Sequence, residues 1–102
     1  MKEIRFSSQY KKDAKRYRHQ IAKMEKVAYI LRLLRDDIEI PPEYKPHKLT
    51  GDFKNCMECH VEGDLLLIWI DESENIIGVL RLGSHSEVFG KGAKKIKNFI
   101  LI

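Results

Sequence analysis

The sequence predicts a single α+β domain in which two N-terminal helices pack on a twisted, mainly antiparallel β-sheet. Its 102 residues, 43% of them hydrophobic, are enough for one compact core but not comfortably for two. Apolar residues recur at helical spacing in the first third, and short β-type segments separated by polar turns follow. We therefore expect one domain over residues 1–102, in which residues 91–102 are a basic C-terminal extension.

The first third of the chain predicts a strand and two helices. Residues 2–6 form a candidate strand, and Ser7 or Ser8 then offers a side-chain oxygen that caps a helix over about residues 8–18. A second helix is expected over about residues 22–36. Two apolar stripes are expected to face the core: Tyr10, Ala14, Tyr17 and Ile21, and then Met24, Val27, Ile30, Leu31 and Leu34.

After these helices, the segment IPPEYKP predicts a non-helical connector, because its prolines lack backbone donors and favour extended neighbours. Strands are then expected over about residues 53–61, 64–71 and 76–82, with residues 71–75 as a polar turn. Either Leu66, Ile68 and Ile70 or the alternate residues Leu65, Leu67 and Trp69 form the core side of the middle strand. The tail KKIKNFILI fits a strand or a short helix.

Charge is segregated along the chain. Residues 1–35 hold eleven Lys and Arg against three acids, residues 36–90 hold four against twelve, and residues 91–102 hold four lysines. The cluster in YKKDAKRYRHQ favours a binder of phosphate backbones or a solvated helix face. No apolar run approaches the roughly 20 residues of a membrane span, and no secretory signal is visible. We expect a cytoplasmic protein without a membrane partner.

The stretch NCMECH places two cysteines and a histidine at the spacing of c-type haem attachment. In a strand, however, Cys56 and Cys59 point to opposite faces and cannot hold one ion. We therefore expect half-buried free thiols and neither a metal nor a cofactor. The alternative is a metal-binding or redox module that uses both cysteines and His60.

The segment HVEGD predicts a hairpin whose turn type decides which side chains meet. A three-residue loop ending at Gly63 pairs His60 with Asp64, so that an imidazole and a carboxylate stand side by side. A two-residue loop, Glu62-Gly63, puts these side chains on opposite faces. Both loop types are open at the level of sequence.

Three segments in order, YKPHKLTG, CHVEGDLLLIW and LRLGSHSEVFG, resemble the YafQ branch of the RelE-type bacterial toxins over about residues 1–90. The resemblance implies a RelE-like fold and an endoribonuclease (an mRNA interferase) that cuts message in the ribosomal decoding site and blocks translation. It implies silencing by a cognate antitoxin of the RelB or DinJ type. The implied site residues are the histidines His47, His60 and His85, the acid Asp64, the aromatic Phe89 and the supporting Arg81.

Metal-free RNA cleavage needs a base for the 2′-hydroxyl, positive charge on the phosphorane and an acid for the 5′-oxygen. Histidine suits both proton transfers because either protonation state is accessible near neutral pH. We expect His85 as the acid, His47 or Asp64 as the base, and His60 as a positioning or charge-sharing group. Arg81 would hold the phosphate. The basic residues expected to bind substrate or ribosome are Lys11, Lys12, Lys15 and Arg16.

Phe89 fits either a ring that stacks on a base or one that caps the core at the sheet edge. The sequence also departs from the family pattern in one strand. Where these toxins commonly carry an arginine shortly before the hairpin histidine, this chain has Met57 and Glu58. A catalytically inactive relative that binds RNA or the ribosome is therefore an alternative.

Overall fold

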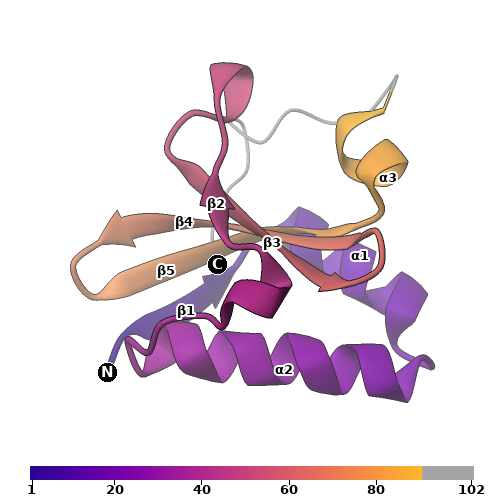
Figure 1. Cartoon of the computed structure of the whole chain (residues 1–102), viewed down its shortest axis with the longest axis horizontal. Helices are drawn as coiled ribbons and strands as arrows, with labels where there is room; N and C mark the ends of the chain where they lie inside the picture. Colours follow the sequence, from indigo (N-terminus) through magenta and orange to yellow (C-terminus); the bar gives the residue numbers. More distant parts are fainter. Residues whose placement is uncertain (91–102) are drawn as a thin grey trace.

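The computed structural model describes residues 1–90, so the expected C-terminal extension lies outside the described residues. Within them the chain forms a five-stranded sheet of order β1-β5-β4-β3-β2 (Figure 1). Strand β1 pairs with β5 in parallel, and the other neighbouring strands are antiparallel. The predicted α+β class is confirmed. The strands are β1 (Glu3–Phe6), β2 (His47–Lys48), β3 (Cys56–Glu62), β4 (Leu65–Ser73) and β5 (Ile76–Gly83).

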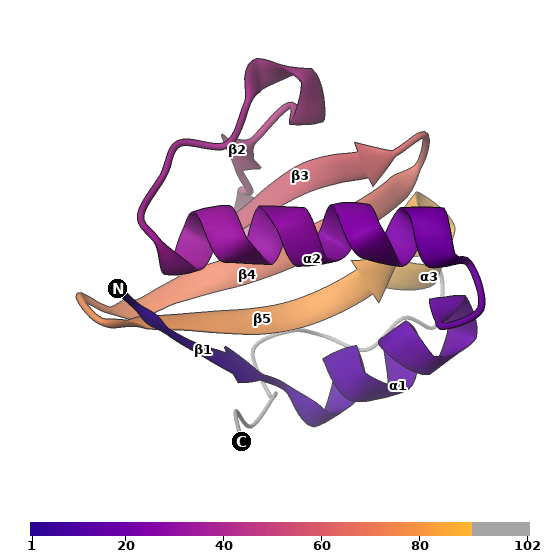
Figure 2. The ribbon, with the colours of Figure 1, turned by 90° about the horizontal axis from the view of Figure 1, so that it is seen from below.

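Helices α1 (Ser8–Tyr17) and α2 (Ile21–Arg35) lie together on one side of the sheet (Figure 2). The hydroxyl oxygen of Ser7 accepts a hydrogen bond from the Tyr10 backbone at 2.9 Å and starts α1. The same hydroxyl donates to the Leu80 carbonyl at 2.7 Å, which ties the start of α1 to β5. This buried serine therefore fixes where the first helix leaves the sheet.

The helix-covered face carries the larger core, and the alternate residues Leu65, Leu67 and Trp69 are the ones on β4 that face it. The predicted stripes mostly pack here, including Tyr10, Val27 and Ile30. Ile21 was predicted to be buried but is 66% exposed. This prediction is wrong because Ile21 is the first residue of α2, where the chain has just turned away from α1.

The opposite face of the sheet is also covered, although the sequence predicted no element there. A short helix, α3 (His85–Phe89), places Val88 against Ile68, Leu80 and Cys56 in a second apolar cluster. Figure 1 shows α3 on the side of the sheet away from α2.

The connector contains a short 3-10 helix, Pro42–Tyr44. It is followed by β2, which was not predicted, and by a second 3-10 helix, Gly51–Phe53, at the start of the strand predicted from residue 53. Among residues 1–90 no helix has the length and apolar character needed to cross a membrane.

Candidate active site

The hairpin between β3 and β4 places His60 and Asp64 differently from either predicted loop. His60 pairs with Leu66 and Glu62 with Leu65, so the turn consists of Gly63 and Asp64. Gly63 has a φ of 55°, a left-handed conformation that glycine adopts without strain, and Val61 is the extra residue of a β-bulge. The predicted His60–Asp64 pairing is therefore wrong. The turn begins one residue later, which leaves Asp64 exposed at the hairpin tip.

His47 is positioned by the pairing of β2 with β3, where it lies opposite Glu58. Lys45, in a left-handed conformation with a φ of 51°, ends the preceding 3-10 helix and turns the chain into β2. The Lys45 carbonyl oxygen lies 2.7 Å from Nδ1 of His47, and Oε1 of Glu58 lies 3.1 Å from Nε2. Both nitrogens of the ring are thus engaged.

His60 stands next to His47 on this face of the sheet. Their ring centroids are 6.3 Å apart, and the Nδ1 atom of His60 lies 3.5 Å from the Gly63 carbonyl oxygen. Two of the predicted site histidines are therefore brought together from segments that are 13 residues apart in the sequence.

Glu58 is a residue of this cluster that the sequence interpretation did not assign to the site. Its side chain is only 7% exposed, whereas that of His47 is 46% exposed. Because strand residues two apart share a face, the position of Glu58 two residues before His60 was the available signal. Only the tertiary pairing with β2 gives this carboxylate a histidine partner.

His85 and Phe89 come from α3, which starts with a capping box. The Ser84 hydroxyl accepts from the Glu87 backbone at 3.2 Å, and the Glu87 carboxylate accepts from the Ser84 backbone at 2.8 Å. One turn apart, the His85 and Phe89 rings lie 5.2 Å from each other. Phe89 also meets Phe53 edge to face at 4.8 Å, so it partly caps the second core while it borders the exposed His85.

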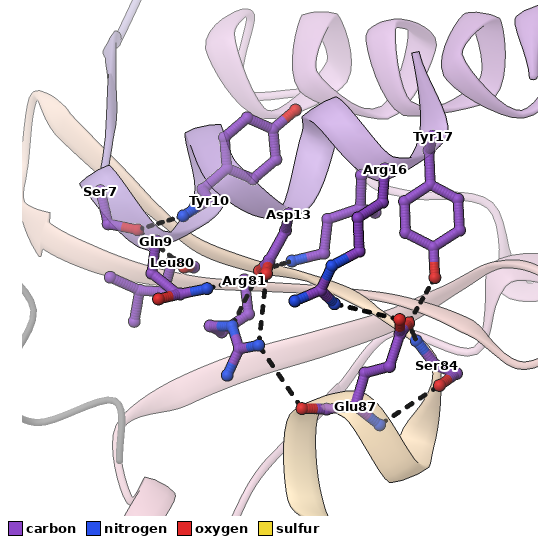
Figure 3. Close-up of polar contacts among 11 residues, drawn as sticks. Ser7, Gln9, Tyr10, Asp13, Arg16, Tyr17, Leu80, Arg81, Ser84 and Glu87 are labelled. Atoms are coloured by element: carbon purple, nitrogen blue, oxygen red, sulfur yellow. Dashed lines mark hydrogen bonds and ion pairs between the residues drawn. The ribbon is translucent and has the colours of Figure 1, made fainter. Parts of the chain in front are cut away.

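A polar network joins α1 to β5 and α3 (Figure 3). Fully buried Asp13 accepts from Nε of Arg81 at 2.8 Å and from the Leu82 backbone at 3.0 Å. Arg81 also reaches the Glu87 carbonyl oxygen at 3.5 Å. In this conformation the buried guanidinium connects three elements of the fold, and its predicted contact with a substrate phosphate stays a prediction.

Glu87 is the second junction of this network (Figure 3). Its carboxylate accepts from the hydroxyl of Tyr17 and from Nη1 of Arg16, the latter at 3.0 Å. The hydrogen bonds from Tyr17 and the Ser84 backbone hold the pKa of the Glu87 carboxyl below its ordinary value. Burial, together with Glu87, raises the pKa of Tyr17 to about 12. Helix α3, and with it His85, is therefore anchored to the C-terminal turn of α1.

The basic residues predicted to bind substrate or ribosome lie on α1. Lys11, Lys12 and Lys15 are exposed. Arg16 is also exposed, but it is the member of the cluster that pairs with Glu87, so it takes part in holding α3.

The two cysteines lie on opposite faces of the sheet, which confirms the prediction from strand alternation. Cys59 belongs to the larger core, on the face covered by α1 and α2, and Cys56 belongs to the second apolar cluster under α3. They are buried rather than half-buried as predicted, because both faces are covered. Burial raises the pKa of Cys56, and it raises that of Cys59 to about 12, where the charge of Glu58 adds to the effect. Within residues 1–90, no three His, Cys, Asp or Glu side chains are grouped so that they could hold a metal ion.

Comparisons with known proteins agree on one family. Residues 2–90 match the family model for the bacterial toxin of type II toxin-antitoxin systems, YafQ. The mRNA interferase toxin YafQ of Escherichia coli K12 is 33% identical over 90 residues, covering 87% of this chain and 97% of that protein.

Solved structures give the same result at the level of the fold. The E. coli DinJ–YafQ complex contains a chain that superposes with a TM-score of 0.77 at 31% identity, covering 88% of this chain and all of that one. A metal-bound toxin from Helicobacter pylori superposes with a TM-score of 0.79 at 34% identity, covering 87% of this chain and all of that one.

Proposed function

The chain belongs to the YafQ family of bacterial toxins of type II toxin-antitoxin systems, and from this premise we propose that it is an mRNA interferase, an endoribonuclease that stops translation by cutting message. One observation carries the proposal beyond the family match. The rings of His47 and His60 stand together on the sheet face that α3, the bearer of His85, also covers. Three histidines from distant segments are thus gathered on one side of the molecule.

These groups suit cleavage by internal attack of the 2′-hydroxyl. A base removes the hydroxyl proton, the 2′-oxygen forms a bond to phosphorus, and the bond from phosphorus to the 5′-oxygen breaks. His85 protonates the leaving 5′-oxygen in this proposal, which its exposure at the start of α3 supports. The base is one of the three remaining predicted site residues: His47, His60 or Asp64. All steps use side chains of the protein, and none of them is routed through a metal.

Phe89 and Arg81 support this set in different ways. The Phe89 ring lies beside His85, and its partly exposed surface offers a stacking platform for a base next to the scissile bond. Buried Arg81 adds a positive charge behind the site and holds α3 through the Glu87 carbonyl.

The ribosome is the proposed setting of the reaction, because the exposed lysines of α1 form a basic surface suited to ribosomal RNA. Replacing Lys11, Lys12 and Lys15 together by Gln should weaken ribosome binding and flatten its dependence on salt. Each lost phosphate contact removes about 0.7 to 0.9 of a released counterion from the slope. The matched triple Lys→Arg variant keeps the charges and should keep the slope. An unchanged slope in the Gln variant would reduce this surface to a solvated helix face.

A cognate antitoxin is the second proposed partner, since the E. coli relative is found in complex with DinJ. Ribosomes and message also make the cytoplasm the proposed site of action.

His85→Ala is the experiment that tests the proposed function. The variant should lose on the order of 100-fold to 10,000-fold in single-turnover cleavage of ribosome-bound message, because a general acid acts mainly in the transition state. Ribosome binding and capture by the antitoxin should be retained. The control is Ser86→Ala, a change at the next exposed residue of α3, which should cut normally. If the wild-type chain binds ribosomes without producing new transcript ends, the protein is the inactive relative and the proposed function is wrong.

A further inference from the structure

Glu58 and His47 make a polar side-chain contact across two neighbouring strands. The carboxylate lies on β3 and the imidazole on β2, directly opposite in the strand register, with Oε1 and Nε2 3.1 Å apart. Cross-strand partners of this kind share a face of the sheet, here the face that also carries His60. Glu58 therefore contacts one site histidine and neighbours another.

Hydrogen-bond chemistry fixes what the nitrogens of His47 can do. The Lys45 carbonyl oxygen, 2.7 Å from Nδ1, can only accept, so Nδ1 carries a hydrogen. With Nδ1 protonated, Nε2 and Oε1 of Glu58, 3.1 Å apart, can form a hydrogen bond only through one further proton. If it resides on Nε2, the imidazolium donates to the carboxylate. If it resides on Glu58, Nε2 accepts from the carboxylic acid. In both forms the lone pair of Nε2 is unavailable to a substrate.

The surroundings of Glu58 are costly for the folded state. Its Oε2 atom is buried and has no hydrogen-bond partner among residues 1–90, and the side chain is only 7% exposed. A buried carboxylate with one unsatisfied oxygen opposes folding unless its remaining partner compensates. Its partner is a half-exposed ring, which offers incomplete compensation. Such an arrangement is expected where a residue serves the site rather than the core.

We propose that Glu58 is a positioning residue that locks His47 with both ring nitrogens engaged, so that His47 helps to orient the site for cleavage and does not act as the base. This inference rests on the proposed function. The carboxylate is buried and the ring is half-exposed, so the ring is the member of the pair that a bound substrate can reach. Within the described part of the chain, Nε2 of His60 makes no hydrogen bond, so the proton of the 2′-hydroxyl passes to His60 or to exposed Asp64.

The test combines a double-mutant cycle with a measurement on the ring itself. Glu58→Gln keeps the shape of the side chain but removes its charge, and should lower single-turnover cleavage on the order of 10-fold to 100-fold, as the loss of a positioning group does. In a His47→Ala background the same change should have no further effect, because Glu58 acts through His47. The matched control is Glu62→Gln on the same strand, whose carboxylate pairs with Lys26. This control should cut at the wild-type rate.

The nitrogen resonances of His47 give a readout that does not depend on activity. In the wild-type protein near neutral pH, Nε2 should lack the signal of a free, pyridine-type nitrogen, and Glu58→Gln should change it. A free pyridine-type Nε2 in the wild type, or losses that add in the cycle, would overturn the proposal. If Glu58→Gln does not fold, the wild-type spectrum still shows whether Nε2 of His47 is free. Glu58→Asp then replaces Glu58→Gln in the cleavage measurements. Absence of cleavage by the wild type would instead overturn the proposed function, while the spectrum would still report on the pair.

Discussion

Asp13 on α1 and Glu58 on β3 are both buried carboxylates of the described part of the chain, but they are surrounded by very different numbers of hydrogen-bond donors. Asp13 accepts from Gln9, from two nitrogens of Arg81 and from the Leu82 backbone, at distances between 2.8 and 3.3 Å. Glu58 has one partner, His47, and its second oxygen has none within residues 1–90.

This difference separates two uses of a buried charge. A fully satisfied carboxylate can hold elements together, and Asp13 joins α1 to β5 across 68 residues of sequence. A partly satisfied one weakens the fold, which is tolerated where the group serves a site. We therefore expect the two residues to respond oppositely to the same substitution of acid by amide.

Asp13→Asn should have the largest effect on folding. The amide breaks the buried ion pair between Asp13 and Arg81, which costs about 3–5 kcal/mol in the free energy of unfolding. Urea unfolding followed by circular dichroism would measure the loss. A loss below about 1 kcal/mol would mean that Asp13 is not a structural anchor, and the comparison would fail.

Replacing both cysteines by serine should be the next largest perturbation, and it tests whether the thiols that flank Glu58 on β3 take part in cleavage. A hydroxyl buried in either apolar cluster should cost about 1–3 kcal/mol of stability. Cleavage should nevertheless stay within a few-fold of wild type, since neither thiol touches substrate on this interpretation. If this variant is inactive while His85→Ala cuts normally, the NCMECH segment is the functional site.

Tyr17→Phe tests the Glu87 junction that extends the Asp13 network to α3. Loss of the hydroxyl that donates to Glu87 should cost about 1.5 kcal/mol, because the acceptor is charged. Cleavage should fall a few-fold as α3 and His85 become less fixed. Tyr29→Phe is the matched control on the exposed side of α2, and thermal unfolding should find it within about 0.5 kcal/mol of wild type.

Glu58→Gln should change stability less than any of these, by about 1 kcal/mol or less, and a gain is the expected direction. The amide removes a buried carboxylate whose second oxygen has no partner within residues 1–90, and the ring left behind, His47, is half-exposed and can be hydrated. The measurement is the same urea titration used for Asp13→Asn, so that the two amide variants are directly compared. Equal losses in the two variants would contradict the distinction between anchor and site residue.

A small dependence of stability on pH should come from Glu87. Its folded-state pKa lies below the ordinary value of 4.5, so the unfolded chain binds the proton more readily. The stability it contributes is therefore present above about pH 4.5 and is lost as the pH falls through the lower, folded-state pKa. Glu87→Gln should lower the melting temperature at pH 7, and the difference from wild type should shrink at pH 3. A constant difference would assign the effect to packing.

The sequence by itself determined the elements whose signal is local. Spacings of three and four predicted α1 and α2 to within about a residue, and strand alternation correctly placed Cys56 and Cys59 on opposite faces. The order of short motifs also indicated the family. These features depend on neighbours within a few residues, where backbone geometry alone fixes which side chains share a face.

Only the tertiary structure decided which side chains meet. The left-handed Gly63 and the bulge at Val61 take Asp64 out of register with His60. The five-residue α3 is too short to show a helical period in the sequence. The pairing of β2 with β3 places His47 against Glu58, and the packing of α1 places Asp13 against Arg81. Such contacts join residues 11 to 68 positions apart, and they form only because burying both faces of the sheet brings these segments together.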